Sequence, residues 1–282
     1  KRLQTAVFDS LIAMCAGGLY DHIGGGFFRY CVDANWRQPH FEKMLYENGL
    51  LASAYAHGYQ VFKTPYFKYI VSDILDFVLR QLTTDDGAFY SSLDADSEGE
   101  EGKFFVWSKA EIEQVLGAER ARLFCRIYDV TEAGNFEGHS ILQRILPRGG
   151  MTDSGEADLA DCRASLFRHR AGRVAPGRDD KVVADWNGLM ISALALGGQV
   201  LDRPQWVSAA GRAADFVRGA MMNADGLLHV YAGGVAKVPA FLDDYAFFGR
   251  GCLDLFEAGG RESDLGTALF CATRLLDEFR HE

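Results

Sequence analysis

Three polar residues, His40, Asp185 and Asp244, each stand immediately before an aromatic residue at the start of an apolar stretch. Imidazole and carboxylate groups are the side chains that most often transfer protons in enzymes. The apolar stretch behind each of them has the spacing of a helix. If the three helices begin at the same end of the fold, the three polar side chains converge on one basin. The pattern therefore predicts an acid–base site at the starts of three helices.

Carboxylates and aromatic residues also recur in the segments that flank these helices, which is typical of a carbohydrate site. Aromatic faces stack on sugar rings, and carboxylates bind hydroxyl groups or transfer protons. The candidates for acid–base catalysis are His40, Asp180, Asp185, Asp243 and Asp244. The candidates for substrate binding are His22, Arg29, Trp36, Glu42, Asp94, Asp96, Trp107, Trp186 and Tyr245.

Each of these residues also has a structural explanation. Taken singly, Asp185 and Asp244 are explained equally well as helix N-caps, because a carboxylate accepts the free N–H groups of a first turn. A lone histidine such as His40 is more often a buried or capping residue than a catalytic one. The functional interpretation depends on the recurrence of polar residues at one position of a repeat.

Two further motifs suggest binding sites only weakly. The glycines at 24–26 do not continue into a dinucleotide-binding or Walker pattern, so a phosphate cradle is disfavoured. Asp94, Asp96 and Glu98 match the first ligand positions of a calcium-binding EF loop, but Phe105 stands where that loop needs its bidentate glutamate. The acidic segment is therefore either a solvated turn or the rim of a pocket.

The repeat that positions these residues is a buried helix, an outer helix and a β-hairpin. The buried helices are expected to start at Pro39, at Asp185 and at Asp244, and the first of them is apolar nearly all round. The outer helices are expected over 66–82, 205–222 and 264–279. Asp-Gly pairs at 86–87 and 225–226, flanked by apolar residues, predict two hairpins.

Other elements are expected around this repeat. A helix is predicted over 3–16, a strand over 104–107, and two short helices over 109–128 with a break at Gly117. Ser108 and Glu111 form a capping-box pattern before the first of these short helices. The segment 156–170 has few apolar anchors, which predicts a peripheral helix.

Composition limits the functional classes. The net charge is −10 over 282 residues, with 48% hydrophobic and 24% charged residues. An acidic chain disfavours nucleic acid as a partner and fits a neutral or cationic small molecule. No apolar run approaches the ~20 residues that span a bilayer. The six cysteines are scattered without metal-ligand spacing, so we predict free thiols, a cytoplasmic protein, and neither metal nor cofactor. We predict one domain over 1–282, incomplete at both ends.

Seven segments together resemble the spermatogenesis-associated thioredoxin-domain proteins and their bacterial relatives. These segments are 20–27, 39–46, 94–104, 134–138, 179–181, 186–190 and 242–246. The resemblance implies a mainly α-helical α/α toroid, similar to the N-acylglucosamine 2-epimerases and the six-hairpin glycosidases, with short β-hairpins and an incomplete ring. It also implies a thioredoxin-like domain elsewhere in the full-length protein, since this sequence contains none.

Three functional hypotheses remain open from the sequence. The first is a carbohydrate-active toroid that binds a sugar and acts on it as an epimerase or isomerase, or as a glycosidase. The second is a non-catalytic module that binds a ligand or client together with a thioredoxin-like domain. The third is a toroid that binds zinc, which would need a Cys–His–Asp set that the sequence does not display.

Overall fold

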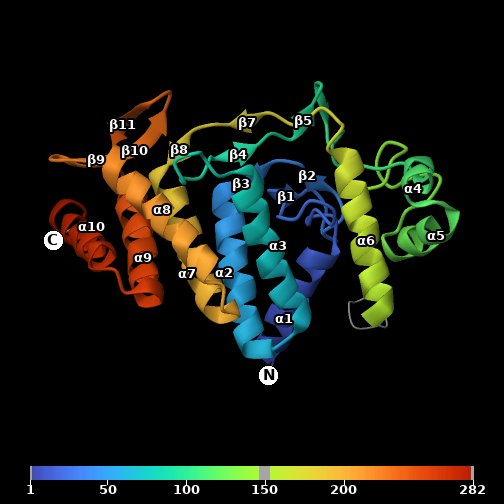
Figure 1. Cartoon of the computed structure of the whole chain (residues 1–282), viewed down its shortest axis with the longest axis horizontal. Helices are drawn as coiled ribbons and strands as arrows, with labels where there is room; N and C mark the ends of the chain where they lie inside the picture. Colours follow the sequence, from blue (N-terminus) through green and yellow to red (C-terminus); the bar gives the residue numbers. More distant parts are fainter. Residues whose placement is uncertain (1, 146–152, 281–282) are drawn as a thin grey trace. The chain divides into compact units, whose positions relative to one another are not determined.

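Two compact units make up the chain (Figure 1). The computed structural model describes residues 2–145 and 153–280. The first unit consists of Lys1–Lys43 and Leu93–Gly177, and the second of Met44–Ser92 and Arg178–Glu282. Two compact units can belong to one domain. The predicted single, incomplete domain therefore stays a prediction.

Three inner helices, each covered by an outer helix, form the body of the second unit (Figure 1). The inner helices are α2 (Leu45–Phe62), α7 (Ala184–Leu201) and α9 (Leu242–Gly259), and α7 packs against both others. The outer helices are α3 (Pro65–Gln81) on α2, α8 (Pro204–Ala220) on α7 and α10 (Glu262–Glu278) on α9. This arrangement confirms the predicted alternation of buried and outer helices.

Glycines at the contacts allow the inner helices to approach one another closely. A Cβ atom on Gly188 of α7 would lie 2.4 Å from the backbone carbon of Phe247 in α9. A Cβ atom on Gly251 of α9 would lie 2.4 Å from the backbone oxygen of Gly188. A larger side chain at either position would force the helices apart. The first turns of α7 and α9 are held together in this way.

The first inner helix begins later than the sequence predicts. Pro39–His40 forms strand β2 and Lys43–Met44 forms strand β3, so α2 starts at Leu45. The ammonium group of Lys43 is bound at 2.7 Å to the buried carboxylate of Asp21 in the first unit. This contact needs an extended backbone before Leu45. Tertiary contacts therefore override the helical pattern of residues 39–44.

Strand β10 (Gly226–Ala232) is the centre of a small antiparallel sheet in the second unit. It pairs with β8 (Val182–Val183), β9 (Met222–Asn223) and β11 (Val235–Pro239). The turn between β9 and β10 contains Asp225, which confirms the hairpin predicted at 225–226. The sheet holds β10 over the first turns of α7 and α9, because β8 leads directly into α7.

The second predicted hairpin, at 86–87, is also present. The N–H of Thr84 donates to the carbonyl of Ala88 at 2.8 Å, and Thr83 forms an antiparallel bridge with Phe89. β4 (Ser92–Leu93) follows it, and β7 (Arg178–Asp179) precedes β8. Like β3, these two strands lie where the chain passes from one unit to the other.

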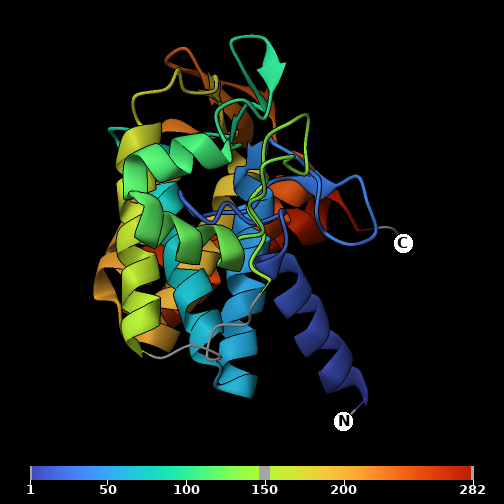
Figure 2. The same ribbon diagram turned by 90° about the vertical axis from the view of Figure 1, so that its right-hand side faces the viewer.

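The first unit contains four helices and four short strands within the described residues. The helices are α1 (Arg2–Ala16), α4 (Lys109–Leu116), α5 (Ala118–Ile127) and α6 (Asp153–Arg170). The strands form two antiparallel pairs, β1 (Tyr30–Cys31) with β2, and β5 (Asp96–Ser97) with β6 (Glu100–Glu101). Figure 2 shows α4 and α5 packed on α6. The predicted break at Gly117 and the cap at Ser108 are confirmed, since Ser108 Oγ accepts the Glu111 N–H at 3.2 Å.

Two predictions for the first unit are wrong. Helix α6 is not peripheral, because Leu159, Cys162 and Leu166 are buried in the core cluster of this unit. The segment 104–107 is not a strand but a turn that ends in a single bridge from Trp107. Its carbonyls are bound instead by the guanidinium group of Arg173, which donates to two of them at 2.7 and 2.9 Å. A side chain thus replaces the strand partner.

No helix in residues 2–145 or 153–280 is both long enough and apolar enough to cross a lipid bilayer.

Candidate functional site

Asp185, Asp244 and His229 form a compact cluster in the second unit. Asp185 lies in the first turn of α7, Asp244 in the first turn of α9, and His229 on β10. One oxygen of each carboxylate and one ring nitrogen of His229 all lie within 4.8 Å of one another. The structure thus brings together two of the three predicted helix-start residues, and it adds a histidine.

Asp244 is the buried centre of this cluster. Its carboxylate accepts the backbone N–H of Phe241 at 2.8 Å and that of Asp185 at 3.2 Å. Nδ1 of His229 donates to both carboxylate oxygens at 2.9 Å. Asp244 is therefore not the N-cap of α9 as its structural explanation proposed, since Phe241 has that position. Likewise Val183, and not Asp185, is the N-cap of α7. From the first turn of α9, Asp244 accepts the N–H of Phe241 and also orients an imidazole. With Nδ1–H committed to Asp244, the tautomer of neutral His229 leaves Nε2 as a proton acceptor.

Asp185 is half-buried beside Asp244 and His229. Its Oδ1 accepts the backbone N–H of Trp186 at 2.8 Å. Burial raises the pKa of Asp185 to about 6, and the negative charge of Asp244 adds to that rise. A carboxyl group with such a pKa is still protonated in a fraction of the protein molecules near neutral pH. Asp185 can therefore donate or accept a proton where an ordinary aspartate is fully ionised.

A local signal in the sequence does mark His229 as a residue that points inward. His229 follows the Asp-Gly turn of the predicted hairpin, on the same side of β10 as the buried Leu227. A polar residue that shares a strand face with a buried one points toward the interior. Nothing local, however, indicates that this face meets the starts of two helices, because the pairing of β8 with β10 joins segments far apart in sequence.

The three donors could also coordinate a divalent metal ion. Two carboxylates and an imidazole suit several such ions. Both oxygens of Asp244 and Nδ1 of His229 already form hydrogen bonds within the cluster, so these atoms have partners without a metal ion. Among the described residues this is the one group of three such donors that lie close enough, and it contains no cysteine. It therefore lacks the Cys–His–Asp set of the zinc hypothesis.

His40 belongs to a separate cluster in the first unit. Its Nδ1 lies 2.6 Å from a Glu101 oxygen and its Nε2 lies 3.2 Å from a Glu42 oxygen. Arg29 donates to the same Glu42 oxygen at 2.9 Å, and the ring of Tyr30 stacks on His40 with centroids 5.2 Å apart. Two predicted binding residues, Arg29 and Glu42, thus lie beside His40. A basin that His40 shares with Asp185 and Asp244 stays a prediction.

The remaining predicted carboxylates are exposed. Asp180 forms an ion pair with Arg178 at 2.5 Å, and Asp243 is exposed in the first turn of α9. Asp94 and Asp96 are exposed at the start of the β5–β6 hairpin. That hairpin is exposed to solvent, and Ser97, Glu98 and Glu100 also line a cavity of about 470 Å³ in the first unit, so both explanations of the acidic segment stay open. The catalytic roles of Asp180 and Asp243 stay predictions.

The predicted aromatic residues divide into accessible and buried ones. Trp36 and Trp186 are half-buried, and the ring of Trp186 lies 4.9 Å from that of Tyr46. Trp107 is fully buried, with the guanidinium group of Arg173 4.1 Å from its ring centre. Tyr245 is also buried, and its hydroxyl accepts the N–H of Leu227 at 3.1 Å. Trp107 and Tyr245 therefore serve packing, and neither ring has a free face for a sugar.

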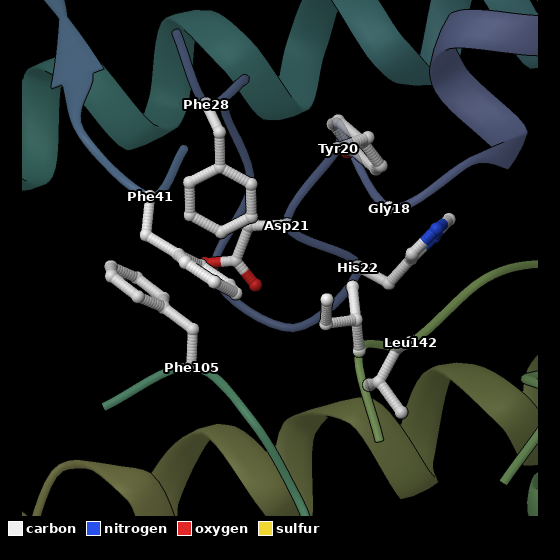
Figure 3. Close-up of a pocket in the computed structure, with 9 residues that line it drawn as sticks. Gly18, Tyr20, Asp21, His22, Phe28, Phe41, Phe105 and Leu142 are labelled. Atoms are coloured by element: carbon white, nitrogen blue, oxygen red, sulfur yellow. The ribbon is translucent and has the colours of Figure 1, made fainter. Parts of the chain in front are cut away.

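Buried ionic contacts account for the motif at 20–27. The carboxylate of Asp21 accepts two hydrogen bonds from Arg170, at 3.0 and 2.9 Å, and one from Lys43 at 2.7 Å. Burial alone would raise the pKa of Asp21, but Arg170 and Lys43 hold it far below its usual range. Figure 3 shows the carboxylate of Asp21 beside the aromatic rings of the same unit, with His22 directed away from it.

His22 is likewise held by the first unit. Its Nε2 lies 3.1 Å from the carbonyl oxygen of Gly17, and its ring packs edge-on against Tyr20 and Tyr128. The adjoining cavity has a volume of about 10 Å³, which is room for a water molecule and too small for a sugar (Figure 3). The geometry gives His22 a structural role in this segment.

Comparison with known proteins supports the expected resemblance. No family model matches the sequence. Over 311 aligned residues the chain is 34% identical to spermatogenesis-associated protein 20 of Homo sapiens, covering 95% of this chain and 40% of that protein. The chain thus spans less than half the length of this relative.

Solved structures show the fold class. Cellobiose 2-epimerase from Spirochaeta thermophila is 9% identical, with a TM-score of 0.59 over 98% of this chain and 54% of that one. Unsaturated glucuronyl hydrolase from Bacillus sp. GL1 is 11% identical, with a TM-score of 0.58 over 98% of this chain and 56% of that one. These likenesses confirm the predicted α/α-toroid fold, and at such low identity they carry no information about residues.

Proposed function

We propose that this chain, a homologue of part of spermatogenesis-associated protein 20, is a carbohydrate-active toroid whose chemistry is proton transfer at a sugar carbon. The observation that carries the proposal is the bond from His229 to both oxygens of the buried Asp244, beside the half-buried Asp185. A base oriented by a buried carboxylate, with a second titrating group close by, is the usual arrangement of a proton-transfer site.

The roles follow from the geometry. Nε2 of His229 accepts the proton from a carbon next to the sugar carbonyl, and the C–H electron pair becomes part of a C=C bond. The carbonyl oxygen takes up the displaced electron pair together with the proton of Asp185. Return of a proton to the same carbon from the opposite face inverts that carbon and restores the carbonyl group. Delivery of the proton to the former carbonyl carbon, with loss of the proton from the neighbouring hydroxyl group, completes an isomerisation instead. Asp244 fixes the ring and stabilises its charged form.

The spacing favours this chemistry over inverting hydrolysis. An inverting glycosidase keeps its two carboxyl groups about 6.5–9.5 Å apart to leave room for a water molecule. An oxygen of Asp185 and an oxygen of Asp244 lie within 4.8 Å. A retaining glycosidase would need one of the two carboxylates as its nucleophile. Asp244 is buried and both of its oxygens are hydrogen-bonded, so it is better suited to position His229. The epimerase or isomerase alternative is therefore the one that we retain.

The test is exchange of sugar C–H hydrogen with deuterium from solvent, measured over a panel of aldoses, ketoses and glycosides of the same sugars. We expect exchange with at least one sugar and a loss of about 100-fold or more in His229→Gln, since general acid–base groups contribute about 10²–10⁴. His57→Gln is the matched control, because His57 is exposed on α2 and bonds only Gln60. Release of a reducing end without exchange would instead support a glycosidase.

The same panel decides between the remaining alternatives. Sugars that bind without any exchange or hydrolysis would favour the non-catalytic module that works with a thioredoxin-like domain. His40→Ala tests the shared basin: loss of exchange equal to that of His229→Gln would place His40 in the reaction. Full activity in His40→Ala would restrict the site to the second unit.

A further inference from the structure

We propose that the Asp185–His229–Asp244 site takes an uncharged or amino sugar, stacked on the ring of Phe241, and rejects sugars that carry a carboxylate or phosphate. This inference rests on the proposed function and adds the substrate class. Sequence patterns did not single out Phe241, which directly precedes α9.

Phe241 joins an accessible ring to the cluster. The residue is 56% exposed, and its ring centre lies 5.1 Å from that of His229 in an edge-on arrangement. Its backbone N–H donates to Asp244 at 2.8 Å, so the position of the residue is fixed relative to the carboxylate. An exposed ring that is held against His229 and the buried Asp244 offers an apolar face for one side of a sugar.

The elements that build the site supply almost no positive charge. Neither α7 nor β10 contains a lysine or arginine. The arginine of α9, Arg250, pairs with Asp254 at 2.8 Å, more than one helical turn beyond Asp244. The lysine of β11, Lys237, is opposite Val230 in the sheet register, and its side chain therefore lies on the face away from His229.

The protein's own carboxylates compete with a bound anion for N–H groups at the helix N-termini. Free N–H groups at a helix start are a common binding site for anions. Here the N–H of Phe241 and that of Asp185 both donate to Asp244, and the N–H of Trp186 donates to Asp185. The protein's own carboxylates thus accept three N–H groups at the two helix starts, two in the first turn of α7 and one from the residue that precedes α9.

An acidic sugar would therefore meet two carboxylates without a compensating cation from these elements. Negative charges that lie close together repel one another more strongly where they are partly shielded from water. A neutral sugar avoids this repulsion, and its hydroxyl groups can donate hydrogen bonds to Asp185. A protonated amino sugar gains attraction. The expected order of affinity is glucosamine at or above glucose, and glucose far above glucuronate and glucose 6-phosphate.

The experiment measures dissociation constants of these four sugars, and of the matching mannose series, for the full chain by calorimetry. We expect glucuronate and glucose 6-phosphate to bind at least tenfold more weakly than glucose. Phe241→Ala should weaken neutral sugars about three- to tenfold, whereas Phe241→Tyr should keep their affinity. Leu253→Ala, which removes a partly exposed apolar side chain within α9, is the control and should have no effect.

The outcomes separate this inference from the proposed function. Acidic sugars that bind as tightly as neutral ones, with binding lost in Asp185→Asn, would overturn the inference and leave the site standing. Neutral sugars that bind unchanged in Phe241→Ala would also overturn it. Absence of binding by every sugar in both series would refute the proposed function and this inference together.

Discussion

Two clusters of ionisable side chains, one in each unit, differ in their balance of charge, and the pKa values of their aspartates shift in opposite directions. In the first unit, one carboxylate, Asp21, is bound by two cations, Lys43 and Arg170, and all three are buried. In the second unit, two carboxylates share a single histidine, and Asp185 stays half-exposed. The pKa of Asp21 lies far below its ordinary range, whereas that of Asp185 is raised to about 6.

This difference separates a structural motif from a candidate site. Asp21 cannot change its protonation near neutral pH, and its oxygens are filled by hydrogen bonds, so it is suited to hold the first unit together. Asp185 has a near-neutral pKa and an accessible carboxyl group, so it is suited to exchange protons. Motifs of equal prominence in the sequence thus have different roles, and the balance of charges distinguishes them.

The largest expected effect comes from breaking the buried cluster. Asp21→Asn would leave Lys43 and Arg170 buried without their counter-charge, so we expect a loss of about 3–5 kcal/mol in the free energy of unfolding. Urea unfolding measures it. Asp180→Asn removes an exposed carboxylate paired with Arg178 and should change stability by less than about 1 kcal/mol. Equal effects of the two substitutions would refute the structural role of Asp21.

A smaller effect is expected from crowding the same cluster. A Cβ atom on Gly24 would lie 2.1 Å from Nη2 of Arg170 and 2.8 Å from Oδ2 of Asp21. Because these atoms are buried and bonded to each other, Gly24→Ala should cost about 2–3 kcal/mol in chemical unfolding.

Gly219→Ala serves as the matched control. No atom lies within 4 Å of the added Cβ in helix α8, so this variant should be neutral or slightly stabilising. A Gly24→Ala protein as stable as the control would mean that Arg170 can move away from Asp21.

In the second cluster, the effect of Asp185 on the free energy of unfolding should depend on pH. A carboxyl group whose pKa is raised on folding stabilises the protein at low pH, and the contribution is lost as pH rises toward about 6. Asp185→Asn should therefore match the parent protein near pH 4 and exceed it by about 1 kcal/mol at pH 7, after allowance for partial exposure. Denaturant unfolding at both pH values measures this, and a variant less stable at pH 7 would contradict it.

The smallest effect is expected at His40. Its partner Glu101 is substantially exposed, so the pair lies largely in water. Glu101→Gln should cost about 0.5 kcal/mol. A double-mutant cycle with His40→Gln isolates the coupling between the two side chains. A coupling above about 2 kcal/mol would show that the interaction between His40 and Glu101 is as strong as that of a buried ion pair and stronger than that of a surface pair.

The inner and outer helices were predictable because periodicity and Asp-Gly turns are local signals. Helices α7 and α9 start within two residues of the predicted positions at Asp185 and Asp244. The extended backbone at 39–44 was not predictable, since it follows from a bond between Lys43 and Asp21 across the fold. His229 was missed for the same reason, because its role depends on the pairing of β10 with β8.

The hairpin of β10 and β11 has a tip made of Gly233 and Gly234, and a side chain added at either would meet open space. His229 lies near one foot of this hairpin and Phe241 follows the other. Extra residues inserted at the tip would lengthen it without entering the core. The length of this turn can therefore change while His229 and Phe241 keep their positions at the base of the hairpin.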